Sequence, residues 1–232
     1  MTETSGLSRA GKLAKNILRP FYGLARGMAR EKFPVIYRDG TRYDNIAAEI
    51  KKMRPSTLVE TGTCTGENAD RMIRLSLWYG ETKYYGFDLF EEMDDKTLNK
   101  EAALWPAAMD RVEARLKSIR LFGRAPEVHL FKGDTAKTLA DAVEKIGSAD
   151  LIFIDGGHSY ETVRSDWENA AKLCHPRTAV FFDDYPNWGV GKLVDEIDQS
   201  KWAVEVLSPE DRFFHTVPPL ICRLARVTMR EP

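Results

Sequence analysis

The segment Val59-Glu60-Thr61-Gly62-Thr63-Cys64-Thr65-Gly66 predicts a tight turn between a buried strand and an amphipathic helix. Gly62 and Gly66 let the backbone turn sharply and approach a ligand where a Cβ atom would clash. The acid Glu60 suits a ligand with a positive group, such as an amino acid ammonium, better than a pyrophosphate. Cys64 occupies a place where a further glycine often appears, so the segment departs from the fingerprint G-x-G-x-x-G. The turn indicates a nucleotide-type ligand at the first strand of a doubly wound α/β domain.

The chain after this turn repeats the same strand-then-helix pattern. Short apolar runs alternate with windows whose apolar residues recur at helical spacing. Continuous apolar strands separated by helices predict a parallel sheet covered on both faces, so the expected fold class is α/β, doubly wound and Rossmann-like. The last two of the seven runs follow one another without a helix, which predicts an antiparallel C-terminal hairpin in a mostly parallel seven-stranded sheet. The predicted strands are residues 57–60, 83–88, 128–132, 150–155, 179–183, 203–207 and 221–228.

Two parts are expected, a basic N-terminal helical arm at residues 1–40 and the α/β domain at residues 41–232. Residues 8–30 contain six basic residues and no acid, with apolar residues at roughly helical spacing and a proline, Pro20, that should kink or split the helix. The arm is predicted to pack on the domain or on a second subunit. Contact with a second subunit would make the protein a homo-oligomer. The alternative is an anionic partner, either a membrane surface contacted peripherally or an acidic substrate.

Composition narrows the classes of partner. The 232 residues carry a formal net charge of −1, so no global field attracts nucleic acid and no nucleic-acid partner is expected. No run of about 18 apolar residues could span a membrane, and the first residues lack an apolar signal region. The three cysteines form no Cys-x-x-Cys pair and indicate reduced thiols. A cytoplasmic protein with a small-molecule partner is the resulting expectation.

Acidic residues stand at the end of nearly every predicted strand. In an open parallel sheet, ligands bind beyond the carboxyl ends of the strands. One such acid could simply cap the next helix. Several acids at one edge predict a binding site instead, and these acids are Glu60, Asp88, Asp134, Asp155 and Asp183.

Two of these acids suit the sugar and base of a nucleotide. Asp88 ends the second strand about 22 residues after the glycine turn, where an acid can accept both ribose hydroxyls. Asp134, the neighbouring amides and Thr135 could bond an adenine edge. Capping of the next helix is the alternative for Asp134 and Thr135, and the two roles are compatible.

A second constellation combines Asp155, His158 and the pair Asp183-Asp184. Adjacent strands would bring these carboxylates together, and hard oxygen ligands select Mg²⁺, Ca²⁺ or Mn²⁺ over zinc. A cation there, most simply Mg²⁺, would make a bound hydroxyl more acidic. His158 follows a Gly-Gly turn, so its ring can reach the same edge and remove the proton. Asp183-Asp184 could alternatively cap the next segment or bind a substrate amine.

Five motifs in order carry a family resemblance: residues 59–66, Gly86-Phe87-Asp88, Gly133-Asp134, residues 150–161 and Phe182-Asp183-Asp184-Tyr185. The set resembles class I S-adenosylmethionine-dependent methyltransferases. It looks most like the bacterial subgroup that includes macrocin-type, metal-dependent O-methyltransferases of natural-product pathways. The resemblance covers roughly residues 44–197 and leaves out the arm and the long connection at 89–125, where substrate identity would be decided.

The resemblance implies a role for each motif residue. Glu60, Gly62 and Gly66, with Thr63 in the same turn, would hold the methionine part of S-adenosylmethionine. Asp88 would hold the ribose, and Asp134 with Thr135 the adenine. The implied catalytic residues are His158 and Asp155, and the implied metal ligands are Asp155, Asp183 and Asp184. The implied reaction is methyl transfer to a hydroxyl of a small molecule, such as a natural-product sugar or phenol.

Two other functions remain open from the sequence. One is a metal-free N- or O-methyltransferase with His158 as the only base, and the other is a binding module that holds the cofactor without catalysis. Residues 188–191, just beyond the acidic pair, could form a small lid with Tyr185 or could simply pack.

Overall fold

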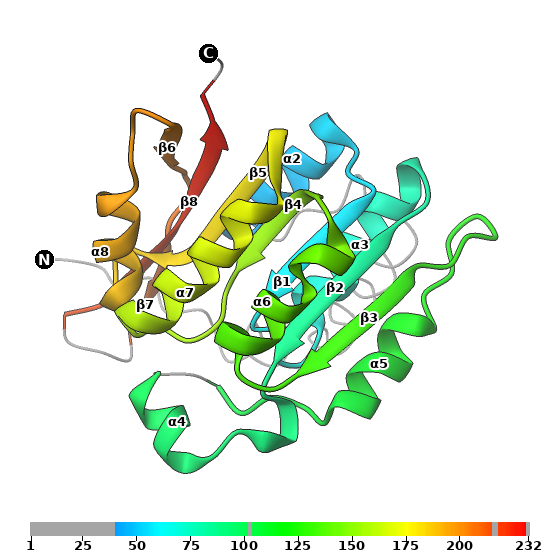
Figure 1. Ribbon diagram of the computed structural model, residues 1–232, viewed down its shortest axis with the longest axis horizontal. Coiled ribbons are helices and arrows are strands. Elements are labelled where there is room, and N and C mark those ends of the chain that lie inside the picture. Colours follow the sequence, from blue (N-terminus) through cyan, green and yellow to red (C-terminus); the bar gives the residue numbers. More distant parts are fainter. Residues whose placement is uncertain (1–39, 102–103, 215–217, 231–232) are drawn as a thin grey trace, which may run out of the picture. The chain divides into compact units, whose positions relative to one another are not determined.

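The computed structural model describes residues 40–101, 104–214 and 218–230, and all of the predicted N-terminal arm except Gly40 lies outside these ranges. The described residues form the predicted α/β fold, with helices on both faces of one twisted sheet (Figure 1). The strands are β1 (Thr57–Thr61), β2 (Lys83–Asp88), β3 (Glu127–Lys132), β4 (Ala149–Ile154), β5 (Cys174–Tyr185), β6 (Trp202–Val206), β7 (Asp211–Phe213) and β8 (Leu220–Met229). The α-helices are α2 (Asp44–Met53), α3 (Glu67–Tyr79), α4 (Asp95–Lys100), α5 (Met109–Lys117), α6 (Thr135–Ile146), α7 (Tyr160–Ala170) and α8 (Trp188–Glu196).

The sheet is mostly parallel with an antiparallel end, as predicted. Its strand order is β3-β2-β1-β4-β5-β8-β6, and β7 pairs with β8 beside this path. Strands β1 to β5 run parallel, whereas β8 is antiparallel to both β5 and β6. The order reverses between β1 and β4, which creates the switch point where such sheets bind ligands.

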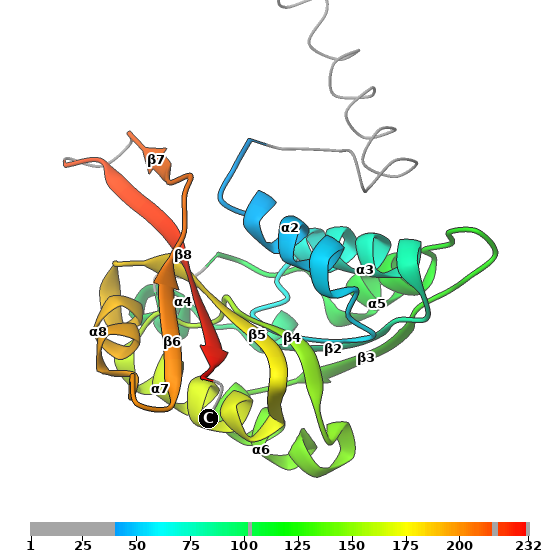
Figure 2. The same cartoon turned by 90° about the horizontal axis from the view of Figure 1, so that it is seen from above.

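Both faces of the central strands are covered. Helices α2, α3 and α5 lie on one face of the sheet, and α6, α7 and α8 lie on the other (Figure 2). Consecutive strand residues point to opposite faces, and Leu58 and Val59 of β1 are both fully buried. This explains why the central strands are continuous apolar runs rather than alternating ones. No helix among the described residues has the length and apolar character to cross a membrane.

The structure corrects three details of the predicted elements. The sequence pattern misses an eighth strand, β7, because its three residues, Asp-Arg-Phe, form no apolar run. Helical spacing extends the helix after the fourth strand to Cys174, but α7 ends at Ala170 and Cys174 begins β5. Pro176 favours this outcome, because the residue before a proline is driven to extended backbone. The sequence pattern marks the connection at 89–125 by its length, whereas the structure has in it a short 3₁₀ helix, η1 (Phe90–Glu92), followed by α4 and α5.

The switch point depends on backbone contact between the ends of β1 and β4. The Asp155 amide donates to the Thr61 carbonyl at 2.9 Å. Gly62 follows with φ of +82°, and a Cβ there would lie 2.0 Å from the Asp155 carbonyl oxygen. Only glycine combines this left-handed backbone with such close approach.

Gly62→Ala is therefore expected to lower the free energy of unfolding by at least about 2 kcal/mol, because strained backbone and overpacking add. Urea unfolding followed by circular dichroism measures this loss. Gly80→Ala is the matched control, since a Cβ at position 80 would have no atom within 4 Å and the backbone φ there is −177°. Equal stability of the two variants would contradict the conclusion that position 62 requires glycine.

Candidate active site

The turn after β1 is held from both sides. The Gly62 amide donates to the Phe87 carbonyl of β2 at 2.8 Å, and the Gly66 amide donates to the Thr63 carbonyl at 2.8 Å. Gly66 has φ of +74° and is the N-cap of α3, and a Cβ there would lie 2.9 Å from Cγ1 of Val112 on α5. Both predicted glycines are thus required by positive φ and close contacts.

Cys64 adopts the backbone conformation that favours glycine. Its φ is +50°, in the left-handed region, which explains why a glycine is expected at this position. Its amide donates to Oδ2 of Asp88 at 2.8 Å. The backbone conformation of Cys64 therefore matters here because it aims an amide at the acid that ends β2.

Asp88 links the first two strand ends. Its other oxygen, Oδ1, accepts from the Phe90 amide at 2.7 Å. Burial raises the pKa of Asp88, although the amides of Phe90 and Cys64 oppose that change. The predicted ribose-binding acid therefore lies directly against the glycine turn, on the neighbouring strand.

Glu60 faces the protein interior. Only 1% of its surface is exposed, and its Oε2 accepts a hydrogen bond from the Tyr84 hydroxyl of β2. Thr63 contacts the same hydroxyl at 3.2 Å. Burial raises the pKa of Glu60 to about 8, against the effect of the Tyr84 hydrogen bond. No motif in the sequence marks Tyr84, which is one aromatic residue among several in an apolar run.

Asp134 caps a helix, which is the alternative role that the sequence predicted for it. It is the N-cap of α6, and its Oδ1 accepts from the Ala136 amide at 3.0 Å. Thr135 is the first residue of that helix. Asp134 is exposed, so capping leaves it accessible, and the adenine contact of these two residues stays a prediction.

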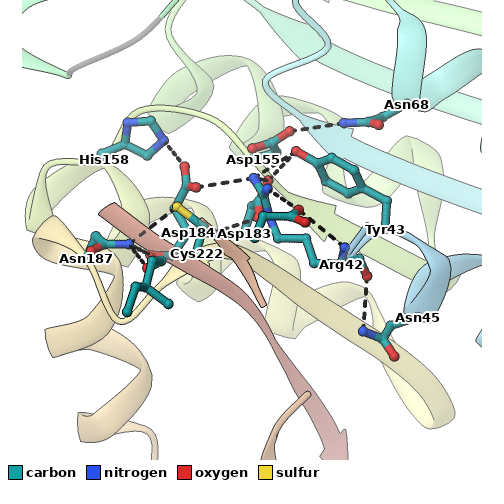
Figure 3. Close-up of polar contacts among 12 residues, drawn as sticks. Arg42, Tyr43, Asn45, Asn68, Asp155, His158, Asp183, Asp184, Asn187 and Cys222 are labelled. Carbon is teal, nitrogen blue, oxygen red and sulfur yellow. Dashed lines mark hydrogen bonds and ion pairs between the residues drawn. The ribbon is translucent and has the colours of Figure 1, made fainter. Parts of the chain in front are cut away.

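The three predicted metal ligands come together at the carboxyl end of β4 and β5. Asp155, Asp183 and Asp184 each offer an oxygen, and these oxygens lie within 4.8 Å of one another. Burial, with the charges of Asp183 and Asp184, raises the pKa of Asp155 well above its ordinary value. We call these three residues the carboxylate cluster (Figure 3).

A buried arginine that the sequence did not reveal lies on this cluster. Arg42 donates from Nε to Asp183 Oδ1 at 2.5 Å and from Nη2 to Asp183 Oδ2 at 2.8 Å. It also contacts Asp184 at 3.3 Å and, from Nη1, Asp211 of β7 at 2.8 Å. Tyr43 donates its hydroxyl to Asp183 Oδ2 at 2.7 Å. Both residues directly precede α2 in the sequence, and no motif distinguishes them there.

His158 is paired at both ring nitrogens. Nδ1 lies 2.6 Å from the Glu101 carbonyl oxygen, and Nε2 lies 2.9 Å from Oδ2 of Asp184. Burial alone would lower the pKa of His158, but the hydrogen bond and charge of Asp184 outweigh it and raise the pKa. The sequence-predicted base is therefore brought to the carboxylate cluster, as expected.

Glu101 fixes the turn that carries His158. Its carboxylate accepts from the Ser159 amide at 2.7 Å and from the Ser159 hydroxyl at 2.9 Å. A Cβ on Gly157 would lie 2.6 Å from the Glu101 carboxylate, so the glycine makes room for it. Glu101 lies in the long connection that the sequence marked only by its position at a strand end.

Trp188 covers one face of the histidine. Its ring stacks on the imidazole at 4.7 Å between centroids, and 47% of its surface stays exposed. The Gly189 amide donates to the His158 carbonyl at 2.9 Å, which fixes the start of α8 against the histidine turn. Tyr185 donates its hydroxyl to Asp195 instead, so the lid proposed for these residues is limited to Trp188 packing on His158.

A family model described as a methyltransferase domain matches residues 59–185, which is more than half of the chain. The chain therefore belongs to the methyltransferase domain family. The match includes Gly62, His158 and the carboxylate cluster, whereas Arg42 and Tyr43 lie outside it. No curated protein sequence matches the chain.

Solved structures share this fold at low sequence identity. The calicheamicin methyltransferase CalS11, a TDP-rhamnose 3'-O-methyltransferase, is 15% identical with a TM-score of 0.53, covering 94% of this chain and 96% of its own. An rRNA methylase from Streptococcus thermophilus is 12% identical with a TM-score of 0.54, covering 84% and 99%. A Streptococcus mutans protein assigned as a methyltransferase, in complex with SAH, is 12% identical with a TM-score of 0.52, covering 82% and 98%.

The buried Glu60 generates a stability prediction. The folded chain keeps the Glu60 proton up to about pH 8, whereas the unfolded chain loses it near the ordinary value of 4.5. The folded state therefore binds more protons in this window, and this group makes the free energy of unfolding fall as pH rises through it. Glu60→Gln should remove that part of the slope, as measured by urea unfolding between pH 5 and pH 8, roughly this window.

Glu144→Gln on the exposed surface of α6 is the matched control and should keep the wild-type slope. A slope in Glu60→Gln that equals the wild-type slope would contradict the buried, protonated state of Glu60.

Proposed function

We propose that this protein transfers a methyl group from S-adenosylmethionine to a hydroxyl of a small molecule. The observation that carries the proposal is the position of His158 beside the carboxylate cluster, at the same sheet edge as the Gly62 turn. Membership of the methyltransferase family supports the reaction type, and the sugar O-methyltransferase activity in the name of CalS11 supports oxygen as the acceptor atom. The rRNA methylase of similar fold shows that fold alone does not choose the acceptor.

The cofactor would bind along the ends of β1, β2 and β3. The Gly62–Gly66 turn, with Thr63, would hold the methionine part, and Asp88 would accept the ribose hydroxyls. Glu60 would support the turn indirectly, because the Tyr84 hydroxyl that it binds also contacts Thr63. Asp134 and Thr135 would border the adenine while Asp134 also caps α6. The S. mutans protein of the same fold was solved with SAH, which supports this choice of cofactor.

His158 would act as the general base. The Glu101 carbonyl accepts from Nδ1, which leaves Nε2 as the nitrogen that takes the proton of the acceptor hydroxyl. The acceptor oxygen then attacks the methyl carbon, the bond from that carbon to sulfur breaks, and S-adenosylhomocysteine leaves. Asp184 lies 2.9 Å from Nε2 and would have to release this nitrogen before it could take the proton.

The carboxylate cluster fits a hard divalent cation such as Mg²⁺ in its donor chemistry. Burial and the charges of Asp183 and Asp184 raise the pKa of Asp155, and a bound cation would offset this repulsion between the carboxylates. When bound, a cation would make an acceptor hydroxyl more acidic and neutralise Asp184, so that Nε2 is free.

The second candidate is a metal-free methyltransferase, which the Arg42–Asp183 pair favours because an arginine already provides positive charge.

The remaining proposals concern partners and compartment. We infer a small-molecule acceptor, no nucleic-acid partner and a cytoplasmic location. For residues 1–40, packing on the domain or on a second subunit is the preferred role, and contact with an anionic partner such as a membrane surface or an acidic substrate is the alternative.

Replacing the base should abolish turnover with little effect on the cofactor. His158→Gln is expected to lower kcat by about 100-fold or more, because a positioned base contributes that much, while affinity for S-adenosylhomocysteine stays within about threefold. Transfer of labelled methyl groups to a panel of sugars and phenols measures the first quantity, and calorimetry the second. His129→Gln, on the edge strand β3, is the control. Full activity in His158→Gln would exclude the proposed base.

Chelation distinguishes a metal-dependent methyl transfer from a metal-free one. Treatment with EDTA is expected to reduce methyl transfer about tenfold or more, and added Mg²⁺ should restore it. The same treatment should leave S-adenosylhomocysteine affinity unchanged. Undiminished transfer in metal-free buffer would instead support the metal-free methyltransferase.

A further inference from the structure

The carboxylate of Asp183 accepts four hydrogen bonds from donors of the protein. An ionised carboxylate has about four acceptor sites, two on each oxygen. Oδ1 accepts from Arg42 Nε at 2.5 Å and from the Asp184 amide at 2.7 Å. Oδ2 accepts from Arg42 Nη2 at 2.8 Å and from the Tyr43 hydroxyl at 2.7 Å. Asp183 is also only 2% exposed, so a ligand would have to compete with these donors for a buried carboxylate.

The other two members of the cluster are less occupied. Within the described part of the chain, the Asp155 carboxylate accepts one long hydrogen bond, from Asn68 Nδ2 to Oδ2 at 3.4 Å, and also interacts with Asp183. Asp184 receives a 3.3 Å contact from Arg42 on Oδ1, the His158 contact on Oδ2 and a hydrogen bond from the Cys222 thiol. The three carboxylates therefore differ in what they can offer a cation, although their oxygens are close together.

Arg42 is held firmly in this position. Asp211 of β7 binds its Nη1 at 2.8 Å and its backbone amide at 3.3 Å. Its side chain is 6% exposed, and its planar guanidinium forms a bidentate ion pair with the Asp183 carboxylate. Displacing it would leave a buried charge without its partner, which is costly.

We propose that Arg42 withholds Asp183 from the divalent cation, so that the wild-type site offers the cation only Asp155 and Asp184. The inference rests on the proposed cation site. Fewer protein ligands leave more coordination positions for water and for acceptor oxygens. A cation held by Asp155 and Asp184 without Asp183 would bind weakly and exchange readily.

Binding of Mn²⁺ alone tests this inference. Calorimetry and the free-ion electron paramagnetic resonance signal would measure its dissociation constant for wild type, Arg42→Lys and Arg42→Met. Lysine keeps the charge but is a point donor that cannot cover both oxygens of Asp183. Both variants are therefore expected to bind Mn²⁺ about tenfold or more tightly than wild type, because a further carboxylate joins the site.

Three controls make the outcome decisive. Arg212→Lys and Arg212→Met change an exposed arginine of β7 and should leave Mn²⁺ affinity unchanged. Adding Asp183→Asn to Arg42→Lys should reverse the gain. If Arg42→Met fails to fold by circular dichroism, Arg42→Lys and Tyr43→Phe remain, and Tyr43→Phe should give a smaller gain because it frees one site on Oδ2.

Unchanged or weaker Mn²⁺ binding in Arg42→Lys would overturn the proposal. A gain in Arg42→Met without one in Arg42→Lys would also overturn it, since charge rather than occupancy would then be responsible. The measurement needs neither cofactor nor acceptor. Failure of methyl transfer with a gain in Mn²⁺ affinity would therefore count against the proposed function alone.

Discussion

The close backbone approach of Gly62 to Asp155 is the constraint on which the site depends. It places the turn after β1 against the turn after β4, where the order of strands reverses. Any side chain at position 62 would separate the two strand ends. Because of this contact, the residues proposed to hold the cofactor and the residue proposed as base share one edge of the sheet.

Electrostatics decides how the acids at this edge are arranged. Carboxylates that leave water need positive charge or a proton to be stable. Arg42 pairs with Asp183, His158 pairs with Asp184, and burial beside these two acids raises the pKa of Asp155. The three carboxylates therefore have different partners and different electrostatic surroundings. This difference gives them different chemical roles, although the sequence shows them only as similar acids at strand ends.

Much of the fold could be predicted because it depends on local patterns. Apolar runs located the seven longer strands, and the missing helix before the last run indicated the antiparallel hairpin. The exception was β7, whose three residues pair with β8 through backbone hydrogen bonds that leave no mark on composition. The sequence does not explain Cys64, because the role of this residue lies in a backbone angle that is set by the turn as a whole.

The sequence by itself determined the strands, the glycine turn and the acids that follow the strands, since periodicity and the φ that glycine permits are local properties. It also indicated that Asp155, His158 and Asp183-Asp184 would meet, because parallel strand ends converge on one edge. Only the tertiary structure decided which partners these residues have. Arg42 lies 141 positions from Asp183, and Glu101 lies 57 positions from His158. Such contacts depend on how α2 and the 89–125 connection pack on the sheet, and no spacing within the chain encodes that packing.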